Sequence, residues 1–342
     1  WESAAGPFTA SSRNGRSWMY QSREKWFYAL SGETAGSIIK PKLIIQPVNN
    51  FPMRRISLLF LFCGCLTIAH TASEVRVGGS DYLEAGVSGF QESILFGMEF
   101  ELDLQMSGTR PARFDLEQGL LDVGLLFQDT DEAPFFEGYE RLPLGYQIVT
   151  VVVNADNPID SIRINRLAGI FGQTEEFDFN QWGDLGLSEW VNRPILPYVL
   201  SIQAGLSSEY FRLRILGNPR FKMNVREADS MNQALDVVRN EETTIALTGY
   251  LGANREGLKI VALTSDILET PTRPNVDTVH FGNYPLKVPL DLYYRVDRTD
   301  VLRPFLEYLL SDAFAESLVG SGILPLPKNF RERTLLELRL QD

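Results

Sequence analysis

The chain has 342 residues, of which 44% are hydrophobic and 22% charged, and its formal net charge is −12. This length is enough for two lobes or domains that each bury a hydrophobic core. Because the chain is acidic and shows no local basic patch, nucleic acid is not an expected partner.

Residues 53–73 have the layout of a secretory signal peptide. Met53 is followed by two arginines, then by an apolar run to about Ala69, and then by small residues. The apolar run is too short to span a bilayer comfortably. We therefore expect export to the periplasm or the extracellular space, with cleavage near Ala72 or Ser73. A buried strand or helix is the alternative interpretation.

A signal peptide acts at an N-terminus, so we expect residues 1–52 to be a non-native or disordered upstream extension. This stretch is rich in Ser, Gly, Arg and Trp and shows no sustained hydrophobic period. A lipid anchor on Cys65 is a further alternative, although the residues before it match a lipoprotein signal poorly.

Cleavage removes both cysteines and leaves His280 as the single histidine. This excludes disulfides, a cysteine nucleophile and any multi-histidine metal site. A Ser-His-Asp triad would have to use His280, and no Gly-x-Ser-x-Gly motif accompanies it. We therefore expect no enzyme activity, no catalytic residues, no metal and no cofactor.

The first half of the remaining chain alternates strand and helix patterns. Strands are predicted where apolar runs end in glycine or alternate with polar residues, and helices where the period is helical. The predicted elements are a strand at 75–80, a helix at 83–100, and strands at 100–108 and 121–127 around a short helix at 116–121.

The second half continues this alternation, and residues 146–158 form the most strongly predicted strand because of their Val and Ile content. Such interleaving favours an α/β architecture with mostly parallel sheets, which bind ligands at strand carboxyl ends. The other predicted elements are helices at 162–171, 230–238 and 301–319, strands at 243–250 and 286–296, and a C-terminal helix that packs on the first lobe.

The order of these features resembles the phosphate-binding component of ABC transporters, a type II periplasmic solute-binding protein. The segments that carry the resemblance are GGSDYL (78–83), GTRPARFDLEQGLLDVG (108–124), VVVNADNPIDSIRINRLAGIFGQTEEFDFNQWGDLG (151–186), ALDVVRNEETTIALTGY, YPLKVPLDLYY and FLEYLLSDAFAESLVGSGILPLP. Together they cover nearly all of residues 75–327.

The resemblance implies an α/β fold with two lobes, a hinge and an interlobe cleft that closes around a ligand. Lobe one would comprise residues 74–153 plus 255–342, and lobe two residues 154–254. The chain would cross between the lobes near Val153 and Gly252. Within lobe two, residues 163–186 would be structural, with the helix turned inward and Trp182 anchoring the following loop.

The resemblance also implies where an anion would bind. Ser80 and Asp81 lie on the first Gly-Ser loop, and Gly108 and Thr109 lie where the family has a ligand-binding hydroxyl. Arg110 follows directly. Each of these residues could instead belong to a plain turn or helix cap, and Arg110 to a solvated basic turn.

Two features of the family are missing. Gln128 stands where the family has a Ser or Asp after the strand at 121–127. The second-lobe loop has no arginine followed by Ser-Gly-Thr, and offers Ser201, Gln203 and Ser207 as candidate ligands instead. The loss of a bidentate guanidinium and a carboxylate acceptor makes phosphate itself doubtful.

Two hypotheses follow. The first is an exported, monomeric solute-binding protein that captures a small anionic or polar solute and delivers it to an ABC permease or a membrane sensor. The second is an interaction or sensor module of the same fold that has lost small-molecule binding.

Overall fold

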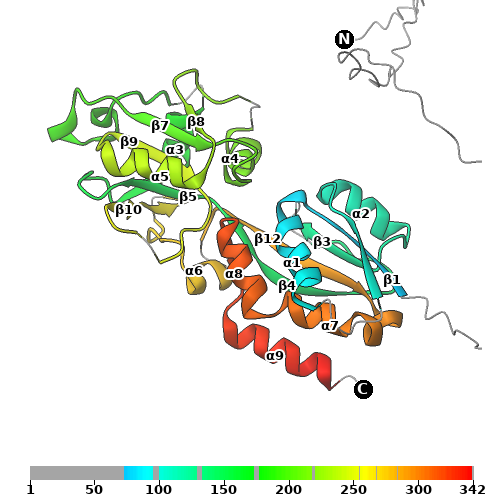
Figure 1. The fold of residues 1–342 in the computed structure, drawn as a ribbon. Coiled ribbons are helices and arrows are strands. Elements are labelled where there is room, and N and C mark those ends of the chain that lie inside the picture. Colours follow the sequence, from blue (N-terminus) through cyan, green and yellow to red (C-terminus); the bar gives the residue numbers. More distant parts are fainter. Residues whose placement is uncertain are drawn as a thin grey trace, which may run out of the picture. The chain divides into compact units, whose positions relative to one another are not determined.

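The computed structural model describes residues 73–94, 100–128, 133–172, 177–217, 220–253, 255–266, 268–282 and 284–340, which belong to one compact unit, Thr67–Asp342. The expected upstream extension 1–52, nearly all of the expected signal peptide and Cys65 lie outside the described residues. Figure 1 shows the described elements.

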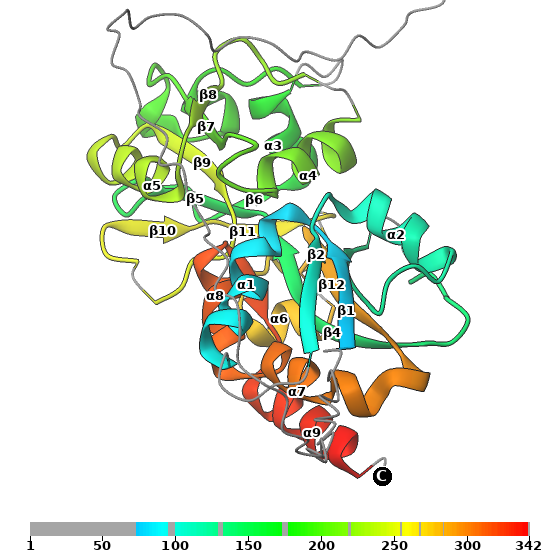
Figure 2. The ribbon, with the colours of Figure 1, turned by 45° about the vertical axis from the view of Figure 1, so that its right-hand side comes forward.

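Lobe one contains a six-stranded sheet with the strand order β13-β4-β12-β3-β1-β2. Successive residues of β3 point to opposite faces of this sheet. Val123 and Leu125 join the core formed with α1, α7 and α8, whereas Leu126 packs with α2 on the other face. Figure 2 shows α1, α7 and α8 gathered beside the sheet. The elements are β1 (Ser73–Gly79), α1 (Glu84–Ile94), β2 (Phe100–Gln105), α2 (Thr109–Glu117), β3 (Val123–Phe127), β4 (Tyr139–Ile148), β12 (Lys287–Arg295), α7 (Thr299–Leu309), α8 (Asp312–Gly320), β13 (Ile323–Pro325) and α9 (Lys328–Arg339).

Lobe two contains a five-stranded sheet with the order β10-β5-β9-β7-β8 and a two-stranded sheet of β11 and β6. The run of valines in β5 is explained by burial on both faces: Val151 and Val153 face α3, and Val152 faces α5. The elements are β5 (Thr150–Asn154), β6 (Ser161–Arg163), α3 (Ile164–Phe171), β7 (Leu196–Leu200), α4 (Ser207–Phe211), β8 (Arg226–Ala228), α5 (Met231–Asn240), β9 (Thr244–Thr248), β10 (Leu258–Ile260), β11 (Ala262–Thr264) and α6 (Val276–His280).

The chain passes between the lobes on two neighbouring strands. β4 ends at Ile148, which pairs with Lys287 at the start of β12. These crossings differ from the expected ones near Val153 and Gly252, because β5 and β10 both belong to the lobe-two sheet. Residues 255–286, expected in lobe one, contribute Val261, Val279 and Leu286 to the lobe-two core.

The sheets are also less parallel than expected. β1 pairs in parallel with β2 and β3, and β7 with β8 and β9, as helical crossovers require. In contrast, β12 pairs antiparallel with β3 and β4, and β5 with β9 and β10. These antiparallel strands are the ones that enter and leave the lobes, so they are not successive strands of a βαβ unit.

Two predicted helices have different limits in the structure. The helix expected at 301–319 is two helices, because Ser311 caps a new one by accepting a hydrogen bond from the Phe314 N–H. The helix expected at 116–121 is α2, which begins at Thr109. The predicted packing of the C-terminal helix is confirmed, since Leu338 of α9 is buried in the lobe-one core.

The segment 163–186 has the structural role that the sequence predicted. Leu167, Ile170 and Phe171 of α3 are buried in the lobe-two core. Trp182 is fully buried, and its indole N–H donates a hydrogen bond of 3.1 Å to the Thr243 carbonyl oxygen. The loop is therefore tied to the start of β9.

Candidate functional site

A cleft of about 560 Å³ is lined by residues of both lobes. This volume is typical of small-molecule sites. Its walls combine polar groups at the carboxyl ends of lobe-one strands with one largely apolar helical surface of lobe two. The lining residues are Ser80, Asp81, Gly108, Thr109, Arg110, Phe127, Gln128, Gln147, Leu206, Glu209, Tyr210, Leu213, Arg214 and Val288.

The first lobe-one loop places Ser80 and Asp81 at the cleft. Gly79, which ends β1, has no room for a side chain, because a Cβ there would lie 2.7 Å from the Leu125 carbonyl oxygen. Ser80 is buried, and its hydroxyl lies 3.4 Å from the Asp81 carboxylate. That carboxylate also accepts a hydrogen bond from the Tyr82 N–H at 3.1 Å.

The start of α2 forms the adjoining wall. Gly108 occupies the N-cap position with φ of 118°, and it supplies no side-chain cap for the N–H groups of the first turn. The Thr109 hydroxyl oxygen accepts the Phe127 N–H at 3.4 Å, which leaves the hydroxyl proton for another acceptor. Arg110 lies in this first turn of α2, and its side chain is exposed.

Gln128 is buried at the back of the cleft and is held by other side chains. Its amide nitrogen donates to the Asp291 carboxylate at 2.9 Å and to the Tyr293 hydroxyl at 3.2 Å. Burial raises the pKa of Asp291, and the nearby Arg141 guanidinium, 3.2 Å from the carboxylate, opposes this shift. Gln128 thus links the cleft to a buried polar network.

Lobe two contributes the helix that runs from α4 into the π-helical segment Arg212–Leu216. Leu206 and Leu213 supply apolar surface, and Glu209 supplies a carboxylate. Glu209 pairs with Arg212, whose Nε lies 3.0 Å from it. Burial raises the pKa of Tyr82, with smaller contributions from the carboxylates of Asp81 and Glu209.

The predicted lobe-two candidates do not line this cleft. Ser201 and Ser207 are buried, and their hydroxyls have no hydrogen-bond partner among the described residues. Gln203 is exposed in the turn between β7 and α4. The structure therefore gathers the six lobe-one candidates at one cleft and leaves these three outside it.

Sequence reasoning did not select the lobe-two wall. Glu209 and Tyr210 belong to the second-lobe loop segment 197–211 and Arg214 follows it, but all three lie on a helix whose cleft-facing side depends on packing between lobes. Gln147 also lines the cleft, from near the end of β4, and its amide donates to the neighbouring Ile148 carbonyl oxygen at 3.0 Å. The sequence signal that could have selected Gln147 is its position as a polar residue within an apolar strand.

The described residues contain no other obvious chemical centre. They hold no group of three or more His, Cys, Asp or Glu side chains placed to bind a metal ion. His280 packs against aromatic rings, including that of Phe330 at 4.3 Å between centroids. In the described part of the chain, no helix combines the length and apolar character needed to cross a membrane.

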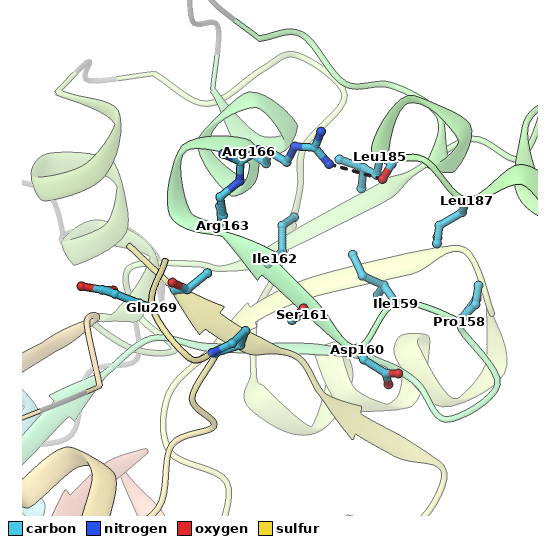
Figure 3. A pocket seen from close by; sticks show the side chains of 12 residues that line it. Pro158, Ile159, Asp160, Ser161, Ile162, Arg163, Arg166, Leu185, Leu187 and Glu269 are labelled. Atoms are coloured by element: carbon cyan, nitrogen blue, oxygen red, sulfur yellow. Dashed lines mark hydrogen bonds between the residues drawn. The ribbon is translucent and has the colours of Figure 1, made fainter. Parts of the chain in front are cut away.

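A second cavity lies within lobe two and shares no lining residue with the cleft (Figure 3). The interlobe cleft is the candidate ligand site, because it joins the ends of β1 and β3 and the start of α2 to the opposite lobe. Ligands of open α/β sheets bind at such strand ends.

Two lobes joined by paired crossing strands, with a cleft between them, define the class: a two-lobed fold like that of type II periplasmic binding proteins. Residues 67–313 match the PBP superfamily domain. This match spans well over half of the chain, and the chain belongs to the PBP superfamily.

Individual relatives are consistent with this assignment. The phosphate-binding protein PstS of Pseudomonas aeruginosa is 26% identical over 255 residues, which cover 70% of this chain and 78% of that protein. The crystal structure of a possible phosphate binding protein from Planctomyces limnophilus matches with a TM-score of 0.60 and 19% identity, covering 78% of this chain and 97% of that one.

An ABC-type phosphate transport receptor from Vibrio cholerae has a TM-score of 0.54 and 15% identity, covering 74% of this chain and all of that one (100%). These structures show the shared fold. The sequence-based resemblance to phosphate-binding components of ABC transporters is confirmed.

Proposed function

We propose that this protein is an exported solute-binding protein that captures a small oxyanion of the phosphate class in the interlobe cleft. The relatives named for phosphate binding motivate the ligand class. The observation that carries the proposal is the start of α2, where Gly108, Thr109 and Arg110 line the cleft together.

The chemistry at this helix start suits an anion. The first-turn N–H groups lack a side-chain cap, and the helix dipole favours negative charge there. The Thr109 hydroxyl proton is available to donate. Among the described residues, the Arg110 side chain has no ion-pair or hydrogen-bond partner, so its guanidinium can bind an oxyanion in bidentate fashion.

Arg110 replaces, in this proposal, the arginine that the lobe-two loop lacks. Asp81 supplies a carboxylate that accepts a hydrogen bond from a protonated oxyanion such as hydrogen phosphate. The ligand is therefore held chiefly by lobe one, and lobe two covers it with Leu206, Tyr210 and Leu213.

We further propose that the two lobes move about the crossings at Ile148 and Lys287 and close over the ligand. The protein would act as a monomer after removal of the signal peptide at 53–73, carry out no chemical step, and pass its solute to an ABC permease or a membrane sensor.

A second candidate function rests on the lobe-two wall. Leu213 is 57% exposed beside the cleft, and the carboxylate of Glu209 faces the same space. A surface of this kind suits contact with another protein better than contact with an anion. The alternative is thus an interaction or sensor module that has lost small-molecule binding.

Isothermal titration calorimetry of residues 67–342 with phosphate tests the proposal. We expect saturable binding that Arg110→Gln weakens by about tenfold or more, since a charge-assisted bidentate contact is lost. Arg113→Gln is the matched control, because it removes the same charge one turn further along α2, where Arg113 pairs with Glu117 at 3.6 Å.

The outcomes separate the two functions. Binding by the wild type and the control, but not by Arg110→Gln, supports the proposal. Equal binding by both variants would remove Arg110 from the site. A ligand at 100 times its Kd adds about 2.7 kcal/mol of stability and so raises the unfolding temperature. If phosphate, sulfate and other small solutes produce neither binding heat nor such a rise, the interaction module is favoured.

A further inference from the structure

The second cavity has a volume of about 380 Å³ and is formed entirely by lobe two. Its floor is β6, and its walls are the first turn of α3, the loop after Trp182 and the turn after β11. The lining residues are Pro158, Ile159, Asp160, Ser161, Ile162, Arg163, Arg166, Leu185, Leu187, Thr264, Glu269 and Pro271.

Two arginines of this cavity have unused hydrogen-bonding capacity. Among the described residues, the Arg163 side chain has no ion-pair or hydrogen-bond partner. Arg166 donates from Nη1 to the Leu185 carbonyl oxygen at 3.4 Å, and its Nε is buried without a partner in the described part of the chain. Arg163 ends β6 at the N-cap position of α3, Arg166 lies in the first turn of α3, and both line the cavity.

The chain has 44 acidic residues against 32 basic ones, yet neither arginine pairs with a carboxylate among the described residues. The two carboxylates that line the cavity are used elsewhere: Asp160 pairs with Lys259 at 3.3 Å, and Glu269 accepts the Ser265 N–H at 3.2 Å. Figure 3 shows these carboxylates at opposite edges, away from the Arg166 guanidinium.

A bound anion would supply the hydrogen-bond acceptors that Arg163 and the Nε of Arg166 lack among the described residues. A buried donor without an acceptor destabilises the folded protein, and a carboxylate satisfies a guanidinium in a planar, bidentate arrangement. The start of α3 adds a favourable dipole at the same place. Arg163, which occupies the N-cap position, supplies no acceptor for the first-turn N–H groups.

The remaining walls define the rest of the ligand. Ile159 and Ile162 are buried side chains at the floor, and Leu185, Leu187 and Pro271 line the sides. This apolar surface suits a compact hydrocarbon or aromatic body, and the volume lies within the range of small-molecule sites.

We propose that this lobe-two cavity is a second binding site, separate from the interlobe cleft, for a small organic carboxylate with an apolar body. Its carboxylate lies at Arg163 and Arg166, and its apolar body contacts the isoleucine and leucine side chains. Occupancy of this site is independent of the ligand in the cleft.

Benzoate is a suitable probe, and backbone amide NMR of the ¹⁵N-labelled full chain is the measurement. We expect saturable shifts at the amides of residues 164–167 and 185–187. Benzamide has the same ring without the charge and should cause no such shifts. This comparison uses only the wild-type protein, so it does not depend on the folding of any variant.

Variants of the two arginines then test whether they bind the carboxylate. Arg166→Met and Arg163→Met should each weaken benzoate binding about tenfold, because each removes a charged donor. Arg239→Met is the matched control and should bind benzoate like the wild type, because Arg239 is a lobe-two arginine outside both cavities that pairs with Asp236 at 2.8 Å. Equal responses to benzoate and benzamide, shifts confined to the cleft, or unchanged binding in both lobe-two variants would overturn the proposal.

Discussion

The Tyr210 hydroxyl in lobe two donates a hydrogen bond of 3.0 Å to the backbone carbonyl oxygen of Lys287, at the start of the crossing strand β12. The ring of Tyr210 packs against the hydrophobic cores of both lobes. This one side chain therefore ties the cleft wall of lobe two to the strand on which the lobes are joined.

Replacement of Tyr210 separates these two contributions. Tyr210→Phe removes the hydrogen bond and keeps the ring, so we expect it to lower the free energy of unfolding by about 1 kcal/mol. Tyr210→Ala also removes packing against both cores and should cost clearly more. Urea denaturation followed by circular dichroism measures both values. Equal effects of the two variants would show that the ring contributes nothing.

Asp291 makes stability depend on pH. Burial raises its pKa in the folded protein above the ordinary value of 3.8, so folding favours the protonated form. The stability that protonation provides is present at low pH and is lost as the pH rises through the raised pKa. Asp291→Asn cannot titrate. The stability of the wild type relative to this variant should therefore fall as the pH rises above the ordinary value of 3.8.

The measurement for Asp291 is the free energy of unfolding in urea at several pH values. Asp156→Asn, which changes an exposed carboxylate, is the control for general effects of charge. If the stability of the wild type relative to Asp291→Asn instead increased with pH, the pKa of Asp291 would be lowered by folding and the prediction would be wrong.

Trp182 should contribute strongly to the stability of lobe two. Trp182→Phe leaves a cavity in the core and removes the donor to the Thr243 carbonyl oxygen, which together should cost about 2 to 4 kcal/mol. Trp190, whose ring lies 6.1 Å from that of Trp182, is the comparison, since its indole makes no such hydrogen bond to the described residues. Trp190→Phe should cost less in the same denaturation experiment.

Gly79 is required by close packing at the end of β1. Gly79→Ala would place Cβ 2.7 Å from the Leu125 carbonyl oxygen, a backbone atom that cannot move without disturbing β3. We expect a loss of about 1 to 3 kcal/mol, which is typical of overpacking. Gly320→Ala has open space around it and should change the melting temperature little. Similar melting temperatures for both variants would show that β1 and β3 tolerate the added methyl group.

Much of lobe one was predictable because its signals are local. The glycines after the first apolar run mark a strand that approaches a neighbour closely, and residues 121–127 read as a buried strand. The loops that follow these strands must meet at one sheet edge, as parallel strands dictate. The resemblance to phosphate-binding components then singled out Ser80, Thr109 and Gln128 on these loops.

The lobe boundaries and the second cleft wall were not predictable in the same way. The run at 146–158 reads as one strand, yet it is β4 in one sheet and β5 in another, and nothing local distinguishes an apolar residue of one core from that of the other. Likewise, Glu209 and Arg214 face the cleft only because the helix that begins at Ser207 is oriented by its packing on β7 and β9 and by the hydrogen bond from Tyr210 to β12.

Local patterns were sufficient for the α/β class, the family and the lobe-one loops of the site, because hydrophobic period, glycine position and motif order are properties of neighbouring residues. Three facts emerged only from the packed molecule: where the chain crosses between lobes, that Ser201, Gln203 and Ser207 stand outside the cleft, and that Arg163 and Arg166 share a cavity without acidic partners among the described residues. Those facts depend on contacts between residues far apart in the chain, whose energies no local pattern encodes.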